Sequence, residues 1–308
     1  MTVSPATGPA GPRAPTSTTI PSLAAITPDQ VAAARRATPR AFGAPLPHRL
    51  RRAALWALFA GLFAWCLVDF AITPARIIDG LGRFGRVLSF MFPPHLWQTW
   101  AEWSEILKGL GETLSMAFLG TVLGALIAFP LSFLGASTIN RIFWFRMTIR
   151  RGYDVIRAFE TLILALIFIR AFGLGPLAGI LAITVSEIGT FAKLFSEALE
   201  NTSSRPVDGV TASGGSRLQS IRYGILPQVL PVHVSILLYN FESNVRSGTI
   251  LGIVGAGGIG FLLSDRIAAY KWDEAWSIIF LIIAMVYVID WLSAKIRKAM
   301  IGDWSGPR

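Results

Sequence analysis

The segment Leu114–Leu134 contains no charged residue. As a helix, it is long enough to cross about 30 Å of hydrocarbon. Other long stretches are similar, and only 15% of the chain is charged, against about a quarter in soluble domains. The alternative is a large soluble protein, but it would need several long, uncharged helices that are all buried in its core. The sequence therefore predicts an all-α integral membrane protein.

The apolar runs predict six membrane-spanning helices. They cover about Ala53–Ile72, Glu112–Ser137, Val155–Phe172, Leu177–Leu199, Gln228–Gly252 and Ala275–Leu292. The turn signal Gly173–Pro176 separates the third from the fourth. We place these helices in a transmembrane domain of residues 51–299, followed by a short cytoplasmic tail of residues 300–308. The segment Thr73–Lys108 has tryptophans three residues apart in its second half, which favours an amphipathic helix on the membrane surface.

Residues 1–50 differ in composition from the rest of the chain. Prolines recur among Ala, Thr and Ser, and large apolar residues are almost absent. Such a segment cannot bury enough apolar surface to fold. We expect a disordered cytoplasmic tail with a short helix near Thr27–Arg36, because Thr27-Pro28 is a suitable helix start.

The positive charges indicate how the chain is oriented. Arg49, Arg51 and Arg52 precede the first span, which places the N-terminus in the cytoplasm. Six spans return the C-terminus to the same side, and the arginine-bearing loops after spans two and four become cytoplasmic. Topology thus explains the net charge of +10, and no nucleic-acid-binding motif is visible. We expect a multi-pass protein of the cell (inner or plasma) membrane.

The cytoplasmic loop Asn201–Pro227 carries the strongest local signals. Pro206 suits a first helical turn, and Gly214-Gly215 ends a helix. Ser216 with Gln219 three residues later forms a capping box, which begins a second helix. A short exposed helix suits a groove on a soluble partner. A structured connector without a partner is the alternative.

This loop resembles the EAA motif of ABC importer permeases. Asp208 takes the Glu position of that motif, Gly209 and Val210 replace the two alanines, and Gly224 replaces the isoleucine. The conserved glycine and the closing Leu-Pro pair of the family pattern are matched at the right spacing. By this resemblance, the residues that couple to an ATPase are Asp208, Gly209, Val210, Gly214, Gly215, Arg217, Leu226 and Pro227.

Three longer strings resemble the phosphonate branch of this family, which includes phosphite and phosphate importers. They are Gly214–Pro231, Leu238–Arg246 and Gly252–Phe261. The resemblance implies two ABC ATPase subunits in the cytoplasm and an extracytoplasmic substrate-binding protein. It also implies a second copy of the permease, and we expect a homodimer. It implies an importer for phosphonate or a related phosphorus oxyanion. The chain has no Walker A motif, so we expect ATP hydrolysis in the partner and no catalytic, metal or cofactor site here.

Several glycines invite a specific interpretation. Gly255, Gly257 and Gly260 formally match the dinucleotide-binding fingerprint, but that site needs a preceding strand. Here they follow a membrane span, so we expect close approach of two backbone segments instead. The small-residue spacing of Gly120 and Gly124 is interpreted in the same way, as helix packing.

Charged residues within spans are costly, and therefore become functional candidates. They are Glu160, Arg170, Glu187, Lys193, Glu242 and Arg246. Glu242 and Arg246 are four residues apart and can pair along one helix face. Both a structural ion pair and a lining of the transport pathway remain open for them. The polar Asn240 and Asn244 in the same span make all four residues candidates for a substrate pathway.

Two other function classes remain as alternatives. One is a permease of the same superfamily for another solute, such as methionine or another amino acid. The other is an ion-coupled secondary transporter, for which internal repeats and broken helices would be expected. No inverted repeat is visible in the sequence.

Overall fold

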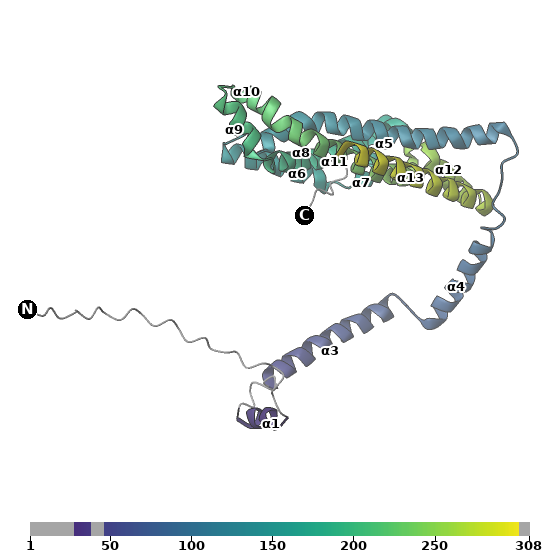
Figure 1. Ribbon diagram of the computed structural model, residues 1–308. Helices are drawn as coiled ribbons and strands as arrows, with labels where there is room; N and C mark the ends of the chain where they lie inside the picture. Colours follow the sequence, from purple (N-terminus) through teal and green to yellow (C-terminus); the bar gives the residue numbers. More distant parts are fainter. Residues whose placement is uncertain (1–27, 38–45, 302–308) are drawn as a thin grey trace, which may run out of the picture. The chain divides into compact units, whose positions relative to one another are not determined.

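The structure is a computed structural model that describes residues 28–37 and 46–301 (Figure 1). Helix is the only regular secondary structure in these two ranges. The chain divides into two units, Met1–Leu81 and Gly82–Arg308, and the division falls within helix α4 (Pro74–Ser89). Each unit is described by itself.

The first unit contains α1 (Pro28–Ala37), α3 (Leu46–Asp69) and the start of α4. The short helix expected near Thr27–Arg36 is confirmed as α1. The rest of the expected tail, residues 1–27 and 38–45, lies outside the described residues, as do residues 302–308 of the C-terminal tail. Helix α3 covers most of the first expected span and begins at Leu46, within the segment assigned to the tail.

The amphipathic helix expected in Thr73–Lys108 lies in the first half of that segment, as α4, and not in the second. Trp97 instead precedes α5 (Trp100–Gly135) in an irregular stretch and is buried. Its carbonyl oxygen accepts a 3.0 Å hydrogen bond from Trp103 Nε1, and the two rings meet edge to face. Trp97 and Trp103 pack with Ile106 and Ile259 in the core, whereas Trp100 is 77% exposed.

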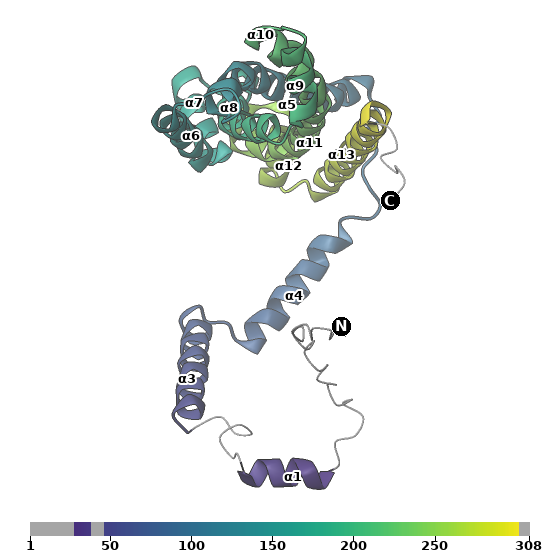
Figure 2. The same ribbon diagram turned by 60° about the vertical axis from the view of Figure 1, so that its left-hand side comes forward.

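The second unit is a bundle of helices joined by short turns (Figure 1). After α5 come α6 (Phe143–Ala158), α7 (Thr161–Phe172), α8 (Pro176–Glu200), α9 (Ser204–Ala212), α10 (Arg217–Gln219), the π-helix η2 (Ser220–Ile225), α11 (Leu226–Leu251), the π-helix η3 (Gly252–Ala256), α12 (Gly258–Ala268) and α13 (Trp272–Ile301). Figure 2 shows α6 and α7 on one flank of this bundle and α13 on the other.

Five helical segments among the described residues are long and apolar enough to cross a membrane. They are His48–Asp69, Trp100–Gly135, Pro176–Glu200, Arg217–Ala256 and Trp272–Ala299. Each contains most of one expected span, so five of the six expected spans are confirmed as helices of sufficient length. Several extend past the apolar run because a helix can continue into water with charged residues on its surface.

The expected third span, Val155–Phe172, is wrong as a single helix. Helix α6 ends at Ala158, and Phe159 and Glu160 have extended backbone angles before α7 begins. Helix α7 has 12 residues, fewer than the roughly 20 that a membrane crossing needs. The physical reason is polarity: α6 carries four arginines and one aspartate, so the apolar segment starts only after Glu160.

Small residues let α5 and α8 approach each other closely. A Cβ atom on Gly120 would lie 2.6 Å from Ile183 Cγ2, and one on Gly124 would lie 2.7 Å from Glu187 Cβ. Neither distance leaves room for a side chain. The helix-packing interpretation of Gly120 and Gly124 is therefore confirmed, and these two helices form the centre of the bundle.

The glycine-rich segment around η3 brings two backbone segments close together, as expected. A Cβ atom on Gly252 would lie 2.8 Å from Gly260 Cα, so the two backbones touch. Two α5 side chains hold the start of α12: Glu112 Oε2 accepts from Gly258 N at 3.1 Å, and Thr113 Oγ1 accepts from Ile259 N at 2.9 Å. In this region two backbone segments touch, and side chains of α5 cap the first amides of α12.

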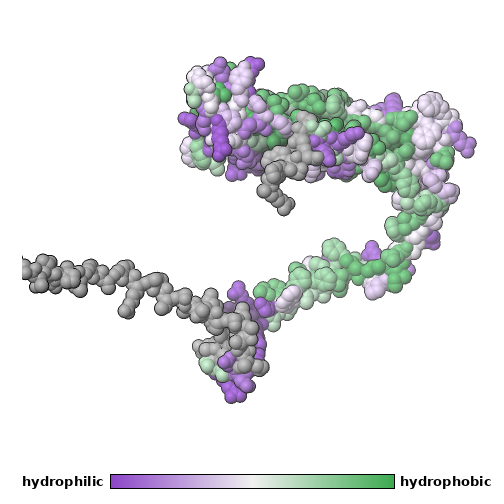
Figure 3. Space-filling model, viewed as in Figure 1, coloured by the Kyte–Doolittle hydropathy of each residue, from purple (hydrophilic) through white to green (hydrophobic). Residues whose placement is uncertain are grey.

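One end of the second unit carries the polar loop with α9 and α10 (Figure 1). Figure 3 shows hydrophilic residues gathered there and a hydrophobic surface along the middle of α5. We refer to the end of the second unit that carries α9 and α10 as the α9 end. Helix α6 lies at the same end of the bundle.

Candidate coupling loop and transport pathway

Helix α9 ends at the glycine pair, as the sequence predicts. Gly214 has a φ of +80°, a backbone conformation that favours glycine. Its amide donates to Thr211 O at 3.0 Å, and the Gly215 amide donates to Val210 O at 2.9 Å. These bonds satisfy carbonyl groups at the end of α9 and turn the chain sharply.

The capping box after this break is also present. Ser216 Oγ accepts from Gln219 N at 3.4 Å, and Gln219 Oε1 accepts from Ser216 N at 2.7 Å. The second helix differs from the expectation in its continuation. Only three residues form α10, and the chain then passes through η2 directly into α11. The second helix of the loop is thus the first part of a long membrane helix.

Contacts at both ends hold α9 against the bundle. A Cβ atom on Gly224 would lie 3.0 Å from Val207 Cα, so the glycine that replaces the motif's isoleucine lets α9 lie directly on η2. The Gln228 amide exchanges two hydrogen bonds with Ser203: its Oε1 accepts from Ser203 N, and its Nε2 donates to Ser203 O. Arg217 Nη2 donates to Ile139 O in the turn after α5. The loop is therefore anchored to α5 and α11.

The eight predicted coupling residues do not form one patch. Asp208, Gly209 and Gly214 are exposed on α9 and its end, while Val210 and Gly215 are half-buried behind them. Leu226 and Pro227 lie in the first turn of α11, at the base of the loop. Leu218 of α10 and Tyr223 of η2, which the prediction did not include, are 76% and 60% exposed. Exposed apolar side chains can mark an interaction surface, but their exposure is visible only in the folded structure.

The predicted pair of Glu242 and Arg246 is confirmed and belongs to a larger network. Arg246 Nη1 lies 3.4 Å from Glu242 Oε1 and 3.5 Å from Asp290 Oδ1 of α13. Glu242 Oε2 in turn lies 3.5 Å from Arg297 Nη2. Sequence reasoning missed Asp290 and Arg297. An aspartate inside an apolar span, with an arginine two helical turns later, was the available signal.

Arg246 lines a groove between α11 and α13. The groove has a volume of about 480 Å³, and its walls include Ile250, Ile283 and Tyr287. The Arg246 side chain is 47% exposed there, whereas Glu242 is largely covered. Asp290 also lines this mostly apolar groove and pairs with Arg246 Nη1, and the partly exposed guanidinium retains further donors for an anion.

The two predicted asparagines lie elsewhere. Asn244 is buried, and its Nδ2 donates to Glu187 Oε1 at 2.8 Å and to Thr121 Oγ1 at 3.0 Å. Asn240 donates to Ile236 O of its own helix. Successive helical residues turn by about 100°, so positions 244 and 246 face different sides of α11. The structure thus brings Glu242 and Arg246 together and places Asn244 in a separate polar contact between α5, α8 and α11.

The remaining charged candidates also lie apart from the groove. Lys193 Nζ bonds to Asp154 Oδ1 of α6 at 2.9 Å. Glu160 and Arg170 are at the two ends of α7, where a charged side chain can reach water. None of these three residues lines the groove that contains Arg246.

Comparison with known proteins gives the following similarities. Residues 120–302 match the family described as "Binding-protein-dependent transport system inner membrane component". HtxC of Stutzerimonas stutzeri, provisionally named a phosphite transport system permease protein, is 38% identical over 77% of this chain and 82% of its own. The phosphate-import permease protein PhnE of Mycolicibacterium smegmatis is 32% identical over 83% of this chain and 48% of its own.

Solved structures share the fold at lower identity. The MetNI methionine ABC transporter in an inward-facing conformation has a TM-score of 0.58 and 23% identity, and the match covers 66% of this chain and 99% of that chain. A bacterial ABC transporter for alginate import has a TM-score of 0.52 and 14% identity, over 80% of this chain and 96% of that chain. With the family match over more than half of the chain, the conclusion is direct: the chain belongs to the binding-protein-dependent transport system inner membrane components.

Proposed function

We propose that this chain is the membrane-spanning subunit of an ATP-driven importer for a phosphorus oxyanion such as phosphonate, phosphite or phosphate. The observation that carries the proposal is the α9 loop. It is a short helix held rigidly on two membrane helices, with an exposed face of acidic, small and apolar residues. Such a helix suits a groove on a soluble partner.

The relatives support the choice of substrate. HtxC and PhnE carry names of phosphite and phosphate transport. A guanidinium group offers paired donors that match the oxygens of a phosphorus oxyanion, and Arg246 presents such a group in the groove. In this proposal the groove faces the substrate path, and Arg246 compensates the charge of the passing anion.

The proposal includes the partners. Two cytoplasmic ATPase subunits receive the Asp208–Pro227 loops of two copies of this chain, and an extracytoplasmic binding protein delivers the substrate. The α9 end lies in the cytoplasm, together with both termini and the N-terminal tail. Closure of the ATPases on ATP pushes the loops, and the two copies switch from an inward-facing to an outward-facing arrangement. The chain itself makes and breaks no covalent bond.

Uptake in cells tests this function. The chain is expressed with its ATPase and binding protein in a host that lacks phosphorus-oxyanion importers, and uptake of radiolabelled phosphite, phosphonate and phosphate is measured. We expect uptake that disappears when the ATPase carries an inactivated Walker A lysine. Uptake of methionine or another amino acid instead would assign a different solute. Uptake that follows a proton or sodium gradient without the ATPase would identify a secondary transporter.

A further inference from the structure

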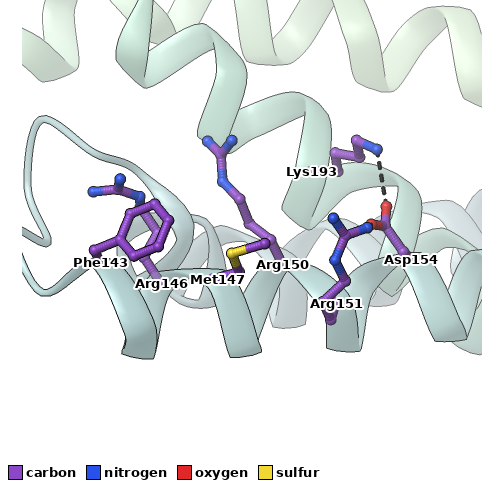
Figure 4. A pocket seen from close by; sticks show the side chains of 7 residues that line it. All are labelled: Phe143, Arg146, Met147, Arg150, Arg151, Asp154 and Lys193. Carbon is purple, nitrogen blue, oxygen red and sulfur yellow. Dashed lines mark hydrogen bonds and ion pairs between the residues drawn. The ribbon is translucent and has the colours of Figure 1, made fainter.

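A second charged pocket lies at the α9 end, away from the groove that contains Arg246. It is formed by one face of α6 and by Lys193 of α8, and has a volume of about 350 Å³. Figure 4 shows the side chains of Arg146, Arg150 and Arg151 extending from α6 toward the same side, with Lys193 facing Asp154. The volume falls within the range of small-ligand pockets, about 300–1,000 Å³.

The pocket has more positive than negative charge. Arg146, Arg150, Arg151 and Lys193 contribute four cations. Asp154 accepts from Arg151 and Lys193, and Glu200 lies 2.7 Å from Arg150 Nη2. Four cations less two carboxylates leaves an excess of two positive charges. The hydrogen bond from Lys193 lowers the pKa of Asp154, so this carboxylate is already ionised at neutral pH and is included in that sum.

Arg146 is the cation with the most remaining capacity. Its Nη1 donates to Asn140 O at 3.1 Å, and its guanidinium lies 5.7 Å from the centre of the Phe143 ring. No carboxylate lies within ion-pair distance of it among the described residues. Arg151, which is 69% exposed, also keeps donors directed to solvent. Arg146 and Arg151 can therefore bind an anion while the ion pair between Arg150 and Glu200 stays intact.

The surroundings of the pocket are those of a membrane boundary. Three consecutive aromatic residues begin α6, and all are well exposed: Phe143 at 55%, Trp144 at 78% and Phe145 at 47%. Aromatic side chains gather at the level of lipid headgroups, where an apolar ring can lie beside polar groups. After α6 the chain continues into the apolar α7, so a basic helix is followed directly by an apolar one.

From this combination we propose that the α6 pocket binds the headgroup of an anionic phospholipid, with its phosphate held by Arg146 and Arg151 and its acyl chains lying along Phe143–Phe145. The proposal does not depend on which solute is transported, but it rests on the α9 end lying at the membrane surface. Basic pockets beside membrane helices select lipid phosphates by this chemistry. Free phosphate offers the same kind of oxygen acceptors and would not need the aromatic residues.

The experiment measures lipid retention by the purified full-length chain. Native mass spectrometry in detergent is performed with added dioleoyl-phosphatidylglycerol, with dioleoyl-phosphatidylcholine, or with inorganic phosphate. The test variant is Arg146→Gln/Arg151→Gln. The matched control is Arg222→Gln/Lys295→Gln, which removes the same charge from two exposed basic residues outside the pocket. We expect phosphatidylglycerol to bind the native chain and the control equally, and the test variant at least tenfold more weakly.

A second measurement uses the native chain, so its result does not depend on whether the variant folds correctly. A photoactivatable phosphatidylglycerol is cross-linked, and the labelled peptides are mapped; we expect them to include residues 143–154. Equal retention by both variants, or labels only elsewhere, would overturn the proposal. Displacement of the lipid by millimolar inorganic phosphate would assign the pocket to free phosphate. Loss of ATPase co-purification with unchanged lipid binding would assign it to the protein partner. Because no readout is uptake, failure here is distinguishable from failure of the importer function.

Discussion

Glu187 of α8 and Asn244 of α11 are joined by a 2.8 Å hydrogen bond between two buried side chains. Asn244 also donates to Thr121 of α5, so one amide group connects three helices. Glu187 lies directly beside Gly124, one of the two glycines at which α5 and α8 approach each other closely. The polar contact therefore lies at a close junction of α5 and α8 and fixes how α11 is placed on these two helices.

Replacing Asn244 tests this junction. The variant Asn244→Leu keeps the size of the side chain but leaves Glu187 and Thr121 without their donor. An unpaired buried polar group costs about 1–3 kcal/mol, and in a domain of this size about 1 kcal/mol lowers Tm by roughly 2–4 °C. Thermal unfolding in detergent, followed by circular dichroism, should show a Tm lower by several degrees. The control Glu187→Gln retains the acceptor oxygen and should melt close to the native protein; equal melting of both variants would contradict the assigned role.

The break after α9 gives a prediction about coupling. In Gly214→Val a branched side chain must adopt a φ of +80°, which is strained, so the loop should lose its shape while the membrane helices remain. We expect normal membrane insertion but a large loss of ATPase on co-purification and of ATP hydrolysis stimulated by the loaded binding protein. Gly152→Ala is the control, because this helical glycine on α6 has open space around it. Native values for Gly214→Val would show that the loop is only a connector.

The network around Arg246 gives a prediction that separates packing from transport. The variant Glu242→Gln/Arg246→Gln removes one acid and one base together, so it leaves the network neutral. Buried ion pairs are often replaceable in this way without loss of stability. We expect normal assembly but loss of uptake, because an anion crossing the bilayer then lacks a compensating charge.

The matched variant for Arg246 is Asp290→Asn/Arg297→Gln, which removes the other acid and base of the same network. If the network only holds α11 against α13, the two double variants should behave alike. If Arg246 meets the anion, only the first should abolish uptake at equal protein level. Uptake by Glu242→Gln/Arg246→Gln at the native rate would identify a purely structural pair.

Orientation is tested by labelling single cysteines from outside intact cells. In a Cys66→Ser background, Leu218→Cys at the α9 end should resist a membrane-impermeant maleimide until the cells are opened. Tyr270→Cys, in the turn between α12 and α13, should react at once. Both positions are highly exposed in the isolated chain, so accessibility of the side chain does not limit either reaction when the chain is expressed without its ATPase. Rapid labelling at position 218 in intact cells would invert the proposed topology.

Local signals in the sequence were sufficient to predict the turn after α9. The glycine break and the Ser216–Gln219 capping box depend on residues only a few positions apart, and both are present. The apolar runs located the membrane helices for the same reason. They did not give the helix ends, because Glu102, Glu105 and Lys108 continue α5 beyond its apolar part. The division between α6 and α7 was missed because the predicted span began at Val155 and treated Glu160 as part of a continuous helix.

The candidate pathway shows where sequence reasoning stops. Glu242 and Arg246 were paired correctly, since a spacing of four is a property of any helix. Asn244 was grouped with them by proximity along the chain, although a rotation of about 200° from Glu242 places it on another face. Asp290 and Arg297 meet the pair only because α13 packs beside α11, and Glu187 meets Asn244 only because α8 does. Those contacts depend on tertiary packing that no short motif encodes.

The side chains of Glu112 and Thr113 that hold the start of α12 have a mechanical consequence. If α12 slid away from α5, the amides of Gly258 and Ile259 would lose their acceptors in a region with little water to replace them. The two helices should therefore travel as one rigid body during any conformational cycle. The motion must then be absorbed elsewhere, and the π-helical turns at the two ends of α11 are the natural places for that membrane helix to flex.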